Sequence, residues 1–117
     1  MSKLSTHVLD TANGHPAAGM KIEFVRNPGP QEQHLKTAVT NGDGRTDELL
    51  LDAGEMAQGE YELRFDVGSY FADLSDSAAQ PGFLNIVPIR FTITNAAEGY
   101  HVPLLCSPWS FSTYRGS

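Results

Sequence analysis

Four histidines are the side chains of this 117-residue chain best suited to moving protons near neutral pH. Two of them lie in segments that alternate between polar and apolar residues, with His7 two positions after Ser5 and His101 directly after Tyr100. A neutral imidazole in such a strand can accept or deliver a proton. A core or interface histidine satisfied by hydrogen bonds would give the same pattern, so spacing alone leaves both interpretations open.

The other two histidines have neighbours typical of a solvated surface. His15 precedes Pro16 in a turn, and His34 follows the polar run of residues 31–33. We therefore expect both imidazoles to be exposed and to take no part in chemistry.

Two arginines could bind or stabilise negative charge. Arg45 follows the Asn-Gly-Asp-Gly turn of residues 41–44, where glycine permits a positive φ that can aim the next side chain inward. A guanidinium placed in this way can clamp a carbonyl or stabilise a developing oxyanion. An exposed turn arginine paired with Asp43 or Asp47 explains the pattern equally well. Arg115, near the end of the sequence, is open to the same two interpretations.

Other chemical motifs do not occur in the sequence. Cys106 has no acidic or basic sequence neighbour and is predicted to be a small buried hydrophobe rather than a nucleophile. There is no Gly-x-Ser-x-Gly motif, no phosphate-binding glycine loop, no metal-ligand spacing and no paired arrangement of carboxylates.

The elements that must position these residues are mainly strands. Apolar and polar residues alternate with a period of two, which predicts strands with one buried and one exposed face. Turns rich in Asn, Gly and Pro separate them, and many short strands at this spacing favour an all-β sandwich or barrel. The clearest alternations are Met20 to Val25, Glu60 to Val67 and Val87 to Thr94.

One segment departs from the alternation. Between Asp66 and Ser75, the residues Tyr70, Phe71 and Leu74 recur at helical spacing, and Asp66 or Ser69 could cap the first turn. We predict one short helix here.

The strand predicted over residues 100–105 is apolar on both faces. One face carries Tyr100, Val102 and Leu104, and the other carries His101, Pro103 and Leu105. A two-layer sandwich covers only one face of a strand, and a chain of this size offers no third layer. We therefore expect another subunit of a symmetric oligomer to cover the second face, with the C-terminal segment near the interface.

Length and composition fit one domain over residues 1–117. The net charge is −6 and the basic residues form no stripe, which argues against a nucleic-acid surface. No apolar run approaches the length of a membrane span, and the N-terminal residues show no signal-peptide pattern. A single cysteine is typical of a reducing compartment. We expect a cytoplasmic protein that contacts neither nucleic acid nor membrane.

Three blocks of the sequence resemble the transthyretin-related 5-hydroxyisourate hydrolases. The ending Tyr-Arg-Gly-Ser is the most specific mark, because the hormone-carrying transthyretins share the fold but lack this tail. The blocks follow the family order and span nearly the whole chain. They are residues 4–11 with Gly14 and 16–19, residues 40–45, and residues 100–105 followed by 107–109 and 112–117.

The resemblance implies a transthyretin-like sandwich of two sheets and eight strands, assembled as a homotetramer with active sites between dimers. It implies hydrolysis of 5-hydroxyisourate, the product of urate oxidation, to 2-oxo-4-hydroxy-4-carboxy-5-ureidoimidazoline, with no metal or organic cofactor. Either histidine could activate the water, Arg45 would stabilise the oxyanion, and the tail would wall the pocket. Carried onto this sequence, the catalytic residues are His7, Arg45 and His101, and the substrate-binding residues are Tyr114, Arg115, Gly116 and Ser117.

Two other interpretations compete with the hydrolase. One is a non-catalytic, transthyretin-like carrier of small aromatic ligands, whose channel would need apolar walls rather than proton-transfer groups. The other is a structural or adhesive β-sandwich module, which usually belongs to a longer secreted chain. The two histidines, Arg45 and the C-terminal tetrapeptide favour the hydrolase over both.

Overall fold

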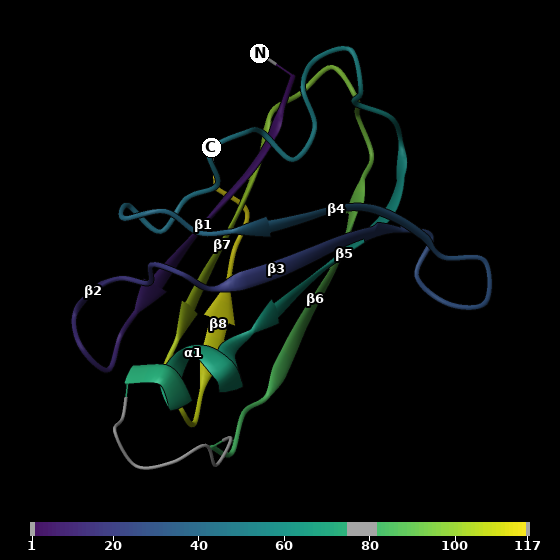
Figure 1. The fold of residues 1–117 in the computed structure, drawn as a ribbon. Helices are drawn as coiled ribbons and strands as arrows, with labels where there is room; N and C mark the ends of the chain where they lie inside the picture. Colours follow the sequence, from purple (N-terminus) through teal and green to yellow (C-terminus); the bar gives the residue numbers. More distant parts are fainter. Residues whose placement is uncertain (1, 75–81, 117) are drawn as a thin grey trace.

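Two four-stranded sheets face each other in the computed structural model, which describes residues 2–74 and 82–116 (Figure 1). One sheet has the order β2-β1-β7-β8 and the other β4-β3-β5-β6. This arrangement confirms the predicted sandwich of two sheets. The elements are β1 (Leu4–Asp10), β2 (His15–Pro16), β3 (Lys21–Arg26), β4 (Gln33–Val39), β5 (Gly59–Asp66), α1 (Val67–Leu74), β6 (Ile86–Ile93), β7 (Tyr100–Cys106) and β8 (Phe111–Thr113).

The core lies between the sheets and is built from the apolar positions of the alternating segments. Each strand sends every second side chain inward, because successive residues of a strand point to opposite faces. The fully buried residues of one sheet therefore pack against those of the other. From the first sheet come Leu4, Val8, Val102 and Leu104, and from the second Ile22, Phe24, Tyr61, Leu63, Phe65, Val87 and Ile93.

Strands β1 and β7 pair in parallel in the middle of their sheet, whereas the other strand pairs are antiparallel. Figure 1 shows this pair crossing the molecule side by side, one from each end of the chain. Their register sets Ser5 opposite His101 and His7 opposite Pro103. Both predicted proton-transfer residues are thereby placed on neighbouring central strands.

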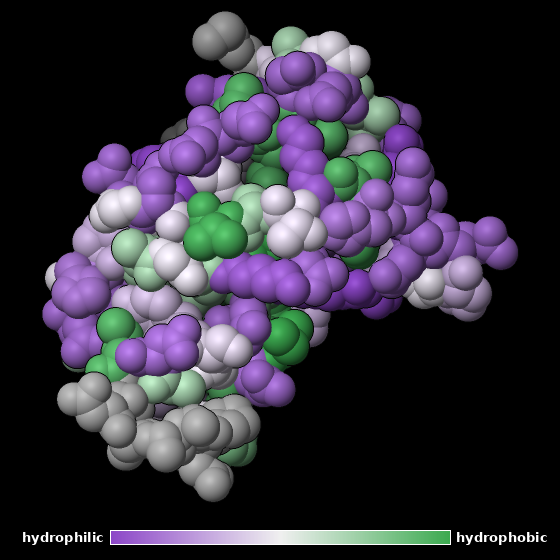
Figure 2. Space-filling model, in the orientation of Figure 1, coloured by the Kyte–Doolittle hydropathy of each residue, from purple (hydrophilic) through white to green (hydrophobic). Residues whose placement is uncertain are grey.

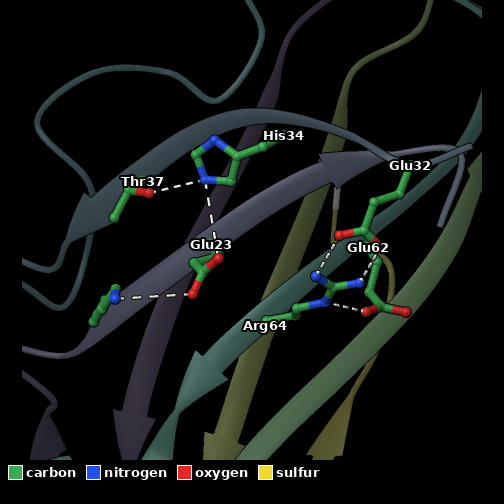
Figure 3. A network of polar contacts seen from close by, with 7 residues as sticks. Glu23, Glu32, His34, Thr37, Glu62 and Arg64 are labelled. Atoms are coloured by element: carbon green, nitrogen blue, oxygen red, sulfur yellow. Dashed lines mark hydrogen bonds and ion pairs between the residues drawn. The ribbon is translucent and has the colours of Figure 1, made fainter. Parts of the chain in front are cut away.

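The outer face of the second sheet differs from the simple alternation. Glu62 was expected on a solvated face, yet it is only 5% exposed, because Arg64 and Arg90 bind its two carboxylate oxygens at 2.5 and 3.2 Å. Arg64 also binds Glu32 with both terminal nitrogens (Figure 3). Val25 lies opposite Glu62 in the sheet and is buried beside this charged cluster, although its position in the alternation predicted a polar face.

Helix α1 forms where helical spacing predicted it. The backbone N–H of Ser69 donates to Asp66 Oδ1 at 3.1 Å, so Asp66 caps the first turn. The Tyr70 hydroxyl donates to the buried Asp10 carboxylate at 2.8 Å and ties the helix to the end of β1. The helix is short, and no helix among the described residues is long and apolar enough to cross a membrane.

The visible face over β3 and β4 is largely hydrophilic, with small apolar areas between the charged chains (Figure 2). Several of the large exposed apolar side chains lie on β6, on β8 and in the segments on either side of β8. They include Ile86, Trp109, Phe111 and Tyr114.

Candidate active site

The site lies on the outer face of the sheet that contains β1 and β7. In β1, Leu4, Thr6 and Val8 point into the core, so Ser5 and His7 point outward and are half-buried. In β7, Val102 and Leu104 point into the core, and His101 points outward and is also half-buried. Strand alternation and the parallel register together bring three polar side chains to one surface.

The two imidazoles form one hydrogen-bonded chain with Ser5. His7 Nδ1 lies 2.6 Å from His101 Nε2, and Ser5 Oγ lies 2.7 Å from His101 Nδ1. Both ring nitrogens of His101 are therefore occupied. His7 Nε2 forms no hydrogen bond with any residue of ranges 2–74 and 82–116, which makes it the open end of the chain.

Arg45 reaches this surface through the turn that precedes it. Gly44 has φ of 74°, and a Cβ at this position would collide with the Val8 carbonyl, so glycine is required. The Gly44 carbonyl accepts the Val8 N–H at 2.8 Å, and the backbones of Arg45 and His7 form a β-bridge. The Asn41 side chain accepts the Arg45 N–H at 3.1 Å and fixes the turn.

The Arg45 guanidinium has no ion-pair partner among residues 2–74 and 82–116. It forms no ion pair with Asp43, with Asp47 or with any other residue in the described part of the chain. Asp47 instead accepts a hydrogen bond from the Asn41 amide at 3.0 Å. The structure therefore does not pair Arg45 with Asp43 or Asp47, the alternative that the sequence left open. Instead, an exposed cation is available beside the histidines.

Burial and Arg45 keep both imidazoles neutral. Partial desolvation lowers the pKa of His7 below its usual 6.5, and the positive charge of Arg45 lowers it further. Desolvation also lowers the pKa of His101, with additional contributions from His7, Arg45 and Lys3. At neutral pH the pair can therefore accept a proton, as a general base must.

The C-terminal segment passes directly over His101. The Gly116 N–H donates to the His101 carbonyl at 2.7 Å, and a Cβ on Gly116 would lie 2.9 Å from His101 Cδ2. The Thr113 hydroxyl donates to the Pro103 carbonyl at 2.7 Å and secures the start of this segment on β7. The close approach explains why the residue beside the imidazole is glycine.

Two predicted substrate-binding side chains lie elsewhere in the described chain. The Arg115 guanidinium stacks 4.0 Å above the Tyr100 ring and donates to Glu98 and to the Gly99 carbonyl. Tyr114 is exposed and lines a groove of about 250 Å³ between β6 and β8. The structure thus brings His7, Arg45, His101 and Gly116 to one surface, but not these two side chains. Ser117 lies outside the described residues.

The remaining candidates behave as their sequence neighbours indicated. His15 and His34 are exposed, and His34 bonds to the Thr37 hydroxyl (Figure 3). Cys106 is fully buried, and burial raises the pKa of its thiol to about 12, so it is no nucleophile at neutral pH. Across residues 2–74 and 82–116, no three His, Cys, Asp or Glu side chains form a metal-binding group.

Ser5 was not recognised as a candidate from the sequence. Its position two residues before His7 shows that both share a strand face, but its contact with His101 depends on the β1–β7 register. That register follows from no local pattern in either segment.

The chain is similar over nearly its whole length to known proteins. Residues 4–116 match the HIUase/Transthyretin family. A 5-hydroxyisourate hydrolase of Deinococcus radiodurans is 51% identical over 114 residues, which cover 97% of this chain and 95% of that protein. The structure of an (S)-allantoin synthase has a TM-score of 0.89 at 45% identity, covering 99% of this chain and 44% of that longer one. A Klebsiella pneumoniae 5-hydroxyisourate hydrolase has a TM-score of 0.81 at 33% identity over 100% of both chains.

Proposed function

The chain belongs to the HIUase/Transthyretin family, and we propose that it is an enzyme that hydrolyses 5-hydroxyisourate, the activity for which its bacterial relatives are named. The reaction opens a cyclic amide-like bond and yields 2-oxo-4-hydroxy-4-carboxy-5-ureidoimidazoline. This assignment places the protein in urate degradation, a branch of purine catabolism. The observation that carries it is the hydrogen-bonded pair of neutral imidazoles beside a guanidinium that has no ion-pair partner in the described part of the chain.

Hydrolysis of this kind sets three chemical tasks. A water molecule must lose a proton, a carbonyl oxygen must gain negative charge, and the leaving ring nitrogen must be protonated. A positioned general base typically contributes about 10²–10⁴-fold to the rate, and one oxyanion donor roughly 10²–10³-fold. The three groups His7, His101 and Arg45 suffice for these tasks without a covalent intermediate.

We assign the general base to His7. Its Nε2 is the open end of the imidazole chain, whereas both nitrogens of His101 already have partners. Water would give its proton to His7 Nε2 as its oxygen attacks the substrate carbonyl. The same nitrogen would then return the proton to the leaving ring nitrogen, while His101 holds the His7 ring in place and shares its positive charge.

Arg45 is the group proposed to orient the substrate and stabilise the oxyanion. Its guanidinium has no competing carboxylate within the described chain, so its donors are free for a ligand. Its charge also lowers the pKa values of both histidines, so the proposed oxyanion donor also helps to keep the general base deprotonated.

The tail residues Tyr114, Arg115, Gly116 and Ser117 are proposed to complete the substrate site. Gly116 lies against His101 and limits the space above the imidazole. Arg115 would serve binding by anchoring the tail to Tyr100 and Glu98. Tyr114 and Ser117 are proposed to contact the polar edge of the substrate where subunits meet.

Assembly as a homotetramer is part of the proposal. Strands β6 and β8 are the outermost strands of their sheets, and the groove between them is lined mainly by apolar side chains. Exposed Phe111 and Tyr114 lie on this side, and His101 and Leu105 on the catalytic face are only half-covered by their own chain.

We propose one domain over residues 1–117 and a cytoplasmic location, where the single thiol of Cys106 would stay reduced.

A carrier of small aromatic ligands is the less favoured alternative. A carrier channel gains affinity from apolar walls, whereas this face presents three hydrogen-bonded polar side chains and a cation. No observation specifically favours the carrier.

Direct assay of substrate decay tests the proposed function. 5-Hydroxyisourate is made fresh with urate oxidase, and the loss of its ultraviolet absorbance is followed with and without protein. We expect decay well above the spontaneous rate. A protein that is folded but does not accelerate the decay would refute the assignment.

A further inference from the structure

The hydrogen-bonded chain at the active site ends in a hydroxyl group on β1. Ser5 Oγ lies 2.7 Å from His101 Nδ1, and this is the hydroxyl's single hydrogen bond within residues 2–74 and 82–116. Ser5 is half-buried and pairs with His101 in the register. The hydroxyl is therefore directed at one ring nitrogen of one catalytic histidine.

Two neutral imidazoles can fill both short contacts in only two ways. In the first, Ser5 donates to His101 Nδ1, His101 Nε2–H donates to His7 Nδ1, and His7 Nε2 carries a proton. In the second, His7 Nδ1–H donates to His101 Nε2, and His101 Nδ1–H donates to Ser5 Oγ. Only the second leaves His7 Nε2 bare, so only the second can take a proton from water.

We infer that Ser5 is a positioning residue that holds His101 in the Nδ1–H tautomer and thereby keeps His7 Nε2 available as the base. This inference rests on the proposed hydrolytic function and adds a residue to it. Ser5 contacts neither water nor substrate in this role, and acts through His101.

The proton movements balance with Ser5 as an acceptor throughout. Water loses a proton to His7 Nε2, and its oxygen bonds to the substrate carbonyl carbon. The Nδ1 proton of His7 then shifts to His101 Nε2, which leaves His101 positive with its Nδ1–H still donated to Ser5. His7 Nε2–H protonates the leaving ring nitrogen, and His101 returns the proton to His7 Nδ1.

A hydroxyl suits this position better than a carboxylate or an apolar side chain. The titratable and charged groups that act on His101 are His7 on β1, Arg45 after the turn of residues 41–44, and Lys3 just before β1, and all three disfavour a positive imidazole. A neutral hydroxyl that accepts the Nδ1–H stabilises the short-lived His101 cation. A carboxylate at this position would instead keep His101 protonated at all times. An alanine would leave Nδ1 with no protein partner.

Substitution of Ser5 tests the inference. Ser5→Ala should lower kcat by about 10–100-fold, the usual size of losing a hydrogen bond to a charged group, with little change in KM. Ser5→Thr keeps the hydroxyl on a residue that suits a strand, and should restore most of the rate. Thr11→Ala is the matched control, since it removes a hydroxyl bonded to the Cys106 carbonyl on the same strand pair, away from the histidines.

The ¹⁵N chemical shifts of the imidazoles provide a readout that does not depend on turnover. In the wild type and in Ser5→Thr, His101 Nδ1 should have the shift of a protonated nitrogen, and in Ser5→Ala it should move toward that of a bare nitrogen. Unchanged shifts in Ser5→Ala, or an equal change in Thr11→Ala, would overturn the inference. Inactivity of the wild type would refute the hydrolase, whereas an active wild type with an equally active Ser5→Ala would refute only the role of Ser5.

Discussion

The outer faces of the two sheets carry polar clusters of opposite kinds. On the sheet of β3, β4, β5 and β6, Glu62 is bound by Arg64 and Arg90. Arg64 is also bound to Glu32, in the segment before β4 (Figure 3). On β1 and β7 the polar groups are neutral imidazoles, and the neighbouring Arg45 has no carboxylate partner in the described chain. The first cluster has its charges satisfied internally, while the second leaves a base and a cation unsatisfied. This difference in pairing is the reason that we propose the β1–β7 face, and not the charged face, as the active site.

Replacement of His101 should have the largest effect. His101→Asn removes the imidazole that orients the His7 ring and takes up its Nδ1 proton, and we expect kcat/KM to fall by about 10²–10⁴-fold. Size-exclusion chromatography with light scattering should give the same assembly state for this variant and the wild type. His34→Asn on the charged face is the control, because His34 is exposed and bonded only to surface groups. Full activity of His101→Asn would remove this histidine from the site.

Replacement of Arg45, whose guanidinium has no ion-pair partner in the described chain, should have the second-largest effect on turnover. Arg45→Ala should lower kcat/KM by roughly 10²–10³-fold, the contribution of one oxyanion donor. The loss should appear with 5-hydroxyisourate at saturating concentration as well. Arg64→Ala removes a guanidinium from the opposite sheet and should leave turnover unchanged. An equal loss of turnover in Arg45→Ala and Arg64→Ala would contradict the proposal that only the β1–β7 face takes part in catalysis.

Crowding the imidazole should have an intermediate effect. Gly116→Ala places a Cβ about 2.9 Å from His101 Cδ2, so the tail or the ring must shift. A displacement near 1 Å can cost up to about 10²-fold in rate. Gly54→Ala provides the comparison, since its Cβ would meet only the Asp52 side chain at an ordinary 3.5 Å. Wild-type rates for both variants would show that the C-terminal segment can shift away from His101 without disturbing catalysis.

The pH dependence should reflect the neutral pair. Since the pKa values of His7 and His101 are both lowered from 6.5, kcat/KM should stay level as pH falls through 6.5. Below the depressed pKa values it should drop by about tenfold per pH unit. The unfolded chain binds these protons near 6.5, so stability should also decline as pH falls below that value. An acidic limb centred above 6.5 would contradict burial of neutral imidazoles.

The smallest effect on catalysis is expected from the charged cluster itself. Glu62→Gln keeps the shape of the side chain but removes the charge that Arg64 and Arg90 share, and should lower the free energy of unfolding by about 1–2 kcal/mol. Urea denaturation measures this change, and kcat/KM should remain that of the wild type. A large loss of turnover would show that the two faces are coupled.

Local patterns were enough to predict β3, β5, β6 and β7, the helix and the buried thiol, but they did not indicate β2, β4 or β8. The alternation in β5 and β6 and the helical spacing of Tyr70, Phe71 and Leu74 are consequences of nearby residues. The family resemblance supplied His7, Arg45 and His101 as a group, and pattern alone left each of them ambiguous.

Long-range pairing explains what the sequence did not reveal. The Ser5–His101 contact requires the register of two strands from opposite ends of the chain. The burial of Glu62 depends on arginines from β5 and β6 together. The Arg115 side chain is drawn to the Tyr100 ring, a contact that depends on how the segment after β8 returns along β7.

The parallel pairing of β1 with β7 also has a kinetic consequence. The contact between His7 and His101 joins positions 94 residues apart, so its formation closes most of the chain into a loop. Contacts between such distant positions are slow to close. During refolding, recovery of hydrolysis would therefore report the docking of β7 onto β1, an event that bulk measures of strand content do not single out.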